Sequence, residues 1–79
     1  MPRMTYSKDA DAAYIYLREG MTVARTRNLD GSRLADYAED GEPIGTELLD
    51  VSEGVNLDGL PKRDIVERLL KERHIPVFA

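Results

Sequence analysis

Residues 30–51 constrain the fold most, because they hold two short runs of alternating apolar and polar residues around an Asp-Gly pair. Glycine accepts the positive φ of a tight hairpin, so Asp40-Gly41 predicts a turn between two antiparallel strands. In the first strand, Leu34 and Asp36 share one face. Ala35 and Tyr37 share the other. The second strand divides in the same way, into Ile44, Thr46 and Leu48 against Gly45, Glu47 and Leu49.

Three further runs predict strands before this hairpin, at residues 3–7, 13–18 and 22–29. In the second of these, Ile15 and Leu17 lie on one face. The opposite face carries Tyr14, Tyr16 and Arg18. Connections of two to six residues are typical of an antiparallel meander, because parallel strands need longer crossovers.

The chain changes character after the last strand. Gly54, Gly59 and the following Pro61 predict a loop at residues 54–60 that crosses the sheet. Residues 61–74 predict a helix, because Pro61 suits a first turn and four apolar residues follow at helical spacing: Ile65, Val66, Leu69 and Leu70. The expected fold is a single α+β domain, residues 1–79: a β-meander of four to five short strands (1–53), the crossing loop (54–60) and a helix covering one face (61–74).

The chain has 79 residues and no cysteine, which excludes disulfides, thiolate nucleophiles and cysteine-containing metal sites. A core of this size supplies only a few kcal/mol beyond the entropy of ordering the chain, so we expect further burial against a partner. No apolar run approaches the roughly 18 residues that span a bilayer, and the N-terminus has no apolar signal region. We therefore expect a soluble cytoplasmic protein without a cofactor.

Charge is distributed unevenly along the chain. The net charge is −4, but residues 30–54 carry eight carboxylates against one arginine, Arg33, which is a local net charge of −7. Nucleic-acid binding depends on neutralising phosphates, so this segment disfavours a nucleic-acid ligand and favours a small basic protein. The same carboxylates can instead serve only to keep a small sheet soluble and its edges unpaired.

Residues with recognition chemistry gather on the predicted sheet. The rings of Tyr14 and Tyr16 lie on the face that the helix would leave uncovered, which favours a homodimer interface there. The residues that we expect to contact a second copy or a basic partner are Tyr14, Tyr16, Arg18, Asp36, Glu39, Asp40, Glu47 and Asp50.

The sequence contains no recognisable catalytic set. Neighbouring carboxylates can raise one another's pKa as general acids do, but that chemistry also needs a pocket that excludes water. Asp9 and Asp11 could ligate a hard cation, yet the spacing of a calcium loop does not follow them, so a turn or cap role is favoured. His74 is expected at the end of the helix, where positive charge is favourable.

Three stretches together resemble one known family: Y-S-K-D-A-D-A-A-Y-I-Y-L at residues 6–17, D-Y-A-E-D-G at 36–41 and I-G-T-E-L-L-D-V-S at 44–52. The combination resembles the Domain of Unknown Function 2283 family of small prokaryotic proteins. That resemblance implies a self-associating sheet protein without established enzymatic activity, and some relatives resemble antitoxins of toxin–antitoxin pairs. It supplies no catalytic residues. The positions that match the family pattern are Asp9, Asp11, Tyr14, Asp36, Tyr37, Gly41, Gly45 and Glu47.

Three functional hypotheses follow. The first is a non-enzymatic, homodimeric interaction protein whose acidic hairpin binds a small basic protein, such as a toxin. The alternative is a small-molecule or metal-dependent enzyme with its site at the dimer interface, where Tyr14, Asp36, Glu47 and His74 would converge. The third is an accessory module without a dedicated partner.

Overall fold

The computed structural model describes all 79 residues and has the predicted α+β composition: one antiparallel five-stranded sheet and one helix near the C-terminus. The strands of the sheet are β1 (Arg3–Ser7), β2 (Ala12–Tyr16), β3 (Arg25–Asp30), β4 (Arg33–Tyr37) and β5 (Pro43–Leu49). Pro43 opens β5, as expected for a residue that has no N–H to donate to a neighbouring strand.

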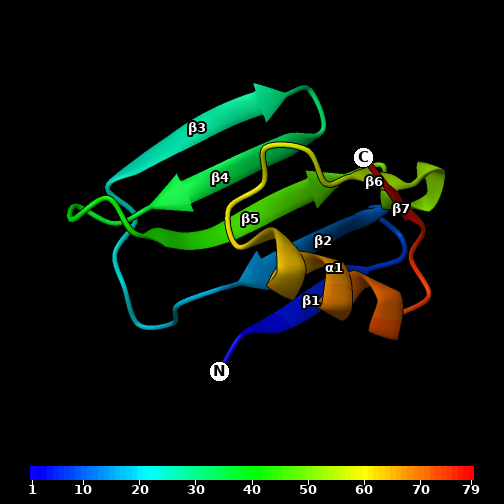
Figure 1. Cartoon of the computed structure of the whole chain (residues 1–79), viewed down its shortest axis with the longest axis horizontal. Coiled ribbons are helices and arrows are strands. Elements are labelled where there is room, and N and C mark those ends of the chain that lie inside the picture. The colour runs from blue at the N-terminus through cyan, green and yellow to red at the C-terminus, as the bar shows by residue number, and fades with distance from the viewer.

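The strand order is β1-β2-β5-β4-β3, so the sheet is not the simple meander that the sequence predicts (Figure 1). The β3–β4 hairpin and the β4–β5 hairpin are present as expected. The difference lies in residues 17–24, which carry the chain from β2 to the far edge of the sheet. This connection is longer than expected, and it leaves the edge of β2 free to pair with β5.

The pairing registers decide which side chains share a face. Ile15, Thr46 and Ala35 stand opposite one another across β2, β5 and β4. Successive residues of a strand point to opposite faces, so the paired residues Tyr14 and Glu47 face the other way. Ile15, Thr46 and Ala35 therefore lie on one face of the sheet and Tyr14 and Glu47 on the other, as the alternation in the sequence predicts.

The residues after the sheet form a second layer. A 3-10 helix, η1 (Val51–Glu53), is followed by β6 (Val55–Asn56), the helix α1 (Arg63–Glu72) and β7 (Val77–Phe78). The buried Val66 and Leu70 of α1 belong to one hydrophobic cluster with Ile15 and Leu48 of the sheet. In Figure 1, α1 lies in front of β1 and β2, while no helix lies in front of β3 and β4.

The helix is shorter than the predicted range of residues 61–74. It begins at Arg63 because Lys62 adopts a left-handed conformation with a φ of 52°, which does not continue into a right-handed helix. His74, with a φ of 58°, likewise lies beyond its end. Residues 54–60, predicted to be a loop, include β6, which pairs in parallel with β7.

One arginine ties the sheet to this second layer. The side chain of Arg33 is only 11% exposed, and its Nε donates to Asp30 Oδ2 at 2.9 Å. Its Nη1 donates to the carbonyl of Asn56 at 2.9 Å and to the carbonyl of Asp58. A guanidinium taken out of water needs such acceptors. Arg33, the one basic residue of residues 30–54, is therefore paired with hydrogen-bond acceptors of the chain itself.

Candidate functional site

The face of the sheet opposite the hydrophobic cluster carries a hydrogen-bonded group of side chains. Asp36 Oδ2 accepts a hydrogen bond from the Tyr14 hydroxyl, and Asp36 Oδ1 accepts one from the Thr26 hydroxyl, both at 2.6 Å. Because β5 lies between β2 and β4, the Tyr14 ring crosses β5 to reach Asp36. We call this surface the open face; the registers place on it Tyr14, Tyr16, Thr26, Leu34, Asp36, Gly45, Glu47 and Leu49.

Gly45 makes this crossing possible. A Cβ atom at this position would lie 2.6 Å from the Tyr14 hydroxyl oxygen and 2.5 Å from the Ile15 carbonyl oxygen. Both distances are shorter than a carbon atom tolerates, so any larger residue would displace the Tyr14 ring or deform β5. A glycine inside a strand is a known sign of such a close approach, although the sequence does not identify the side chain that uses it.

The Tyr14 hydroxyl is held in its protonated form. Burial raises its pKa far above the ordinary value of 10.0, and the hydrogen bond to Asp36 raises it further. The negative charges of Asp36 and Glu47 act in the same direction. Near neutral pH the phenol therefore remains a hydrogen-bond donor to Asp36.

Tyr16 extends the aromatic surface towards the edge strand β1. Its ring meets that of Tyr14 edge to face, with 4.7 Å between the centroids and an interplanar angle of 65°. The guanidinium carbon of Arg3 lies 4.2 Å from the Tyr16 centroid, and Arg3 Nε donates to Glu19 Oε1 at 2.9 Å. These contacts hold both rings in place, and the Arg3 guanidinium lies over the Tyr16 ring.

A pocket of about 320 Å³ lies at one end of the open face. Its lining combines Tyr14, Tyr16 and Asp36 from the sheet with Met21 and Val23 from the connection at residues 17–24. An apolar and aromatic lining with a few polar groups is typical of a ligand site. We call this cavity the Tyr14–Asp36 pocket.

The predicted interaction residues fall into three places. Those on the open face are Tyr14, Tyr16, Asp36 and Glu47. Arg18 lines the Tyr14–Asp36 pocket and pairs with Asp40 at 3.6 Å; Asp40 and Glu39 lie in the β4–β5 turn. Asp50 follows the other end of β5 and accepts a hydrogen bond from the Ser32 hydroxyl at 3.4 Å. The carboxylates of residues 30–54 are thus dispersed and do not form one acidic surface.

Two other predicted groups lie elsewhere. His74 follows α1 in the second layer, so it does not converge with the residues of the open face. Asp11 accepts hydrogen bonds from the Ser52 N–H at 2.9 Å and from the Ser52 hydroxyl at 2.7 Å, a contact between distant parts of the chain and not the local turn or cap bond that the sequence favours. The structure contains no group of three or more His, Cys, Asp or Glu residues placed to hold a metal ion.

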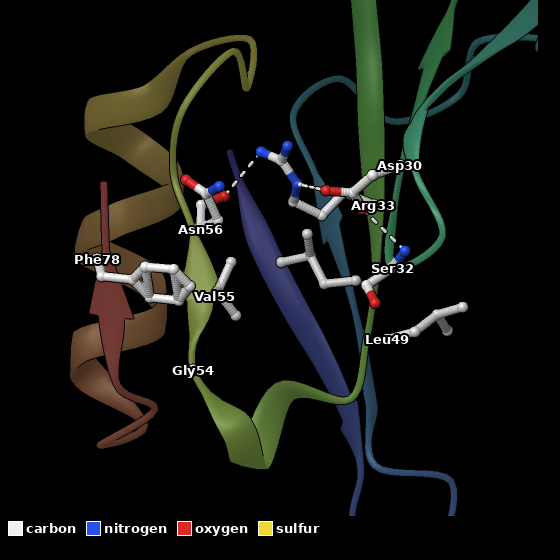
Figure 2. Close-up of a pocket in the computed structure, with 9 residues that line it drawn as sticks. Asp30, Ser32, Arg33, Leu49, Gly54, Val55, Asn56 and Phe78 are labelled. Atoms are coloured by element: carbon white, nitrogen blue, oxygen red, sulfur yellow. Dashed lines mark hydrogen bonds and ion pairs between the residues drawn. The ribbon is translucent and has the colours of Figure 1, made fainter.

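A second cavity, of about 210 Å³, lies where the sheet meets the second layer (Figure 2). Figure 2 shows Arg33 between Asp30 on one side and Asn56 on the other. The Ser32 N–H donates to Asp30 at 2.8 Å, and this bond, followed by Arg33, holds the pKa of Asp30 below its usual range. The polar groups of Asp30, Ser32 and Arg33 are therefore hydrogen-bonded within this cavity. The sequence did not predict this role of Arg33, although a lone arginine in an acidic segment was a signal for it.

One family model, described as protein of unknown function DUF2283, matches residues 3–52, which hold all five strands of the sheet. No curated protein and no solved structure matches the chain. None of the helices has the length and the apolar character needed to cross a membrane. The matched range includes Tyr14, Asp36 and Gly45 and covers more than half of the chain. The chain therefore belongs to the family of proteins of unknown function DUF2283.

Proposed function

We propose that this chain is a non-enzymatic binding module that engages a basic protein through its open face. The observation that carries this proposal is that Asp36 and Glu47 on this face belong to none of the four ion pairs of the structure. Asp36 has only neutral hydroxyl donors, and Glu47 is exposed on the central strand. A surface with uncompensated negative charge attracts a positively charged partner and repels nucleic acid.

The aromatic part of the open face adds contact area to this charge. Tyr14 and Tyr16 are half-buried and fixed by their neighbours, and the half-buried Leu34 and Leu49 extend the same face. Tyrosine side chains at interface centres often supply a large share of the binding energy. The face therefore combines apolar area for affinity with two carboxylates for selectivity.

A binding role fits these side chains better than catalysis does. A general acid or base works best when its pKa lies near the operating pH, but the pKa of Tyr14 is raised away from neutrality. Asp36 is already engaged by two hydroxyl donors. Of the four side chains in the catalytic hypothesis, His74 does not lie on the open face, because it follows α1 in the second layer.

A second copy of the chain competes for the same face. The homodimer expected from Tyr14 and Tyr16 stays a prediction, and stacking two open faces would bring Asp36 and Glu47 near like charges, which is unfavourable. Light scattering after size exclusion at micromolar concentration measures self-association. A dimer that dissociates on Tyr16→Asp would make a second copy the occupant of this face in place of a basic protein.

The narrower form of the proposal is an antitoxin-like role, in which the basic partner is a small toxin. We would capture proteins from the source cells on the immobilised chain, identify those that are small and basic, and titrate each pure candidate by calorimetry. Binding should weaken strongly between about 0.1 M and about 1 M salt, because the Debye length falls from about 10 Å to about 3 Å.

A matched pair of variants locates the interface. Asp36→Asn with Glu47→Gln should weaken binding about tenfold, or about 1.4 kcal/mol. Glu67→Gln with Glu72→Gln, which makes the same charge change on α1, should leave the affinity unchanged. Equal affinities of both double variants, or the absence of any pure basic protein that binds, would refute the proposal.

A further inference from the structure

The Tyr14–Asp36 pocket is suited to one long side chain and not to a larger molecule. Its volume of about 320 Å³ lies near the lower end of the range of about 300–1,000 Å³ for small-molecule sites. Met21 and Val23 on the connection line this pocket and are 39% and 46% exposed. They offer an apolar surface along which an aliphatic stem can lie.

Asp36 supplies the polar end of this pocket. Each of its two carboxylate oxygens accepts one hydrogen bond, from Tyr14 and from Thr26. An ionised carboxylate has about four acceptor positions, so each oxygen keeps capacity for one further donor. Both existing donors are neutral, and they hold the carboxylate in a fixed orientation without neutralising its charge.

The other charges of the pocket are already paired. Glu19 is bonded to Arg3 at 2.9 Å, and Arg18 lies 3.6 Å from Asp40. The charge without a counterpart at this site is therefore that of Asp36. Burial raises the pKa of Tyr14, and the hydrogen bond to Asp36 and the negative charges of Asp36 and Glu47 raise it further.

We infer that the Tyr14–Asp36 pocket receives a guanidinium group, carried by an arginine side chain of the partner. A guanidinium presents a planar fork that can donate to both oxygens of one carboxylate, whereas an ammonium acts as a point charge. The rings of Tyr14 and Tyr16 suit a delocalised cation, and Arg3 already stacks on Tyr16 at 4.2 Å. This inference deepens the proposed function, because it names the group that would anchor the basic partner.

The anchor can be tested without the partner. Nα-acetylarginine methylamide would be titrated into the ¹⁵N-labelled chain and followed by amide chemical shifts. We expect saturable shifts at Tyr16, Met21, Val23 and Asp36, with a dissociation constant of about 1 mM, or about −4 kcal/mol. The citrulline analogue has the same shape without the charge and should bind at least tenfold more weakly; the lysine analogue should fall between the two.

Two variants make the result specific to the pocket. Asp36→Asn removes the charge with little change in size and should weaken arginine binding at least tenfold, while Glu72→Gln on α1 should leave it unchanged. The amide spectrum of each variant reports whether the fold is retained. Arg18→Gln provides a second test within the pocket, because removal of a nearby cation should strengthen binding about twofold to threefold.

The outcomes separate this inference from the proposed function. Equal binding of the arginine and citrulline probes, or unchanged binding by a folded Asp36→Asn variant, would overturn the arginine anchor even if a basic protein binds the open face. Saturable arginine binding in the pocket, with no basic protein found to bind the chain, would retain the anchor and refute the proposed function.

Discussion

The two faces of the sheet are built from the same strands and differ in almost every physical property. On β2, Ala13 and Ile15 are buried in the hydrophobic cluster, whereas the intervening Tyr14 is only half-buried and bonded to a carboxylate. On β5, Leu48 is fully buried while its neighbour Glu47 is exposed. The face that contains the hydrophobic cluster therefore contributes more to the free energy of folding than the open face does.

This division has an energetic reason. A strand alternates its side chains between two faces, so a single layer of cover can bury only half of them. Val66 and Leu70 of α1 lie in the hydrophobic cluster with Ala13, Ile15 and Leu48 of the sheet, whereas the open face contributes no residue to that cluster. The remaining polar groups of the open face are satisfied locally, by the Tyr14–Asp36–Thr26 hydrogen bonds.

The sharpest test of the comparison uses adjacent leucines of β5. Leu48→Ala should cost about 2–5 kcal/mol of unfolding free energy, because it leaves a cavity in the core. Leu49→Ala, on the open face, should cost less than about 1 kcal/mol. Urea denaturation followed by circular dichroism measures both. Similar losses would mean that the open face is buried in solution, as in a stable homodimer.

Substitutions at two glycines test whether the Tyr14 ring needs a residue without a side chain at position 45. Gly45→Ala should cost about 1–3 kcal/mol, since the new methyl group overlaps Tyr14 and the Ile15 carbonyl. Gly31→Ala should change stability by no more than about 0.5 kcal/mol, because a Cβ there meets no atom within 4 Å. Thermal unfolding of the two variants provides the comparison. A stable Gly45→Ala protein would show that the Tyr14 ring does not need to cross β5.

Two threonines on opposite faces should respond with opposite signs. Thr46 is fully buried and its hydroxyl has no partner, so Thr46→Val should stabilise the fold by about 1 kcal/mol. Thr26→Val should destabilise it by about 0.5–1 kcal/mol, because its hydroxyl donates to Asp36. Chemical denaturation measures both values, and the same sign for both would contradict this account of the two faces.

The smallest effect concerns the pH dependence of Tyr14. Its pKa is raised in the folded chain, so its stabilising contribution is complete below the ordinary value of 10.0 and declines as the pH rises above it. The advantage of the parent over Tyr14→Phe, below about 1 kcal/mol for a partly exposed group, should therefore shrink above that pH. Absorbance titration should show one of the four tyrosines ionising late, and this late phase should be missing in Tyr14→Phe.

The sequence predicts the strands and the faces well because both follow from a period of two residues. The β1 range and the two hairpins are as expected, and Tyr14 and Tyr16 lie on the face opposite Ile15. Local turn chemistry at Asp40-Gly41 is enough to place the turn between β4 and β5.

The strand order and the site depend on contacts between distant residues, which the local pattern does not encode. No pattern in residues 17–24 indicates that this connection crosses to the far edge of the sheet, so that β2 pairs with β5. The meeting of Tyr14 with Asp36 follows from that pairing, and so does the need for Gly45 between them. The acidic residues are dispersed for a similar reason: Asp40 precedes β5 and Asp50 follows it, so the two lie at opposite ends of this strand.

The parallel pairing of β6 with β7 affects how the second layer can open. The Val55 N–H donates to the Pro76 carbonyl and the Leu57 N–H to the Phe78 carbonyl, so the segment that contains α1 is fastened at both ends. Because of this pairing, α1 does not unfold progressively from one end. The β6–β7 hydrogen bonds and the side-chain packing of α1 must be lost together. Amide exchange along α1 should then report a single opening event, with one common free energy for the protected positions.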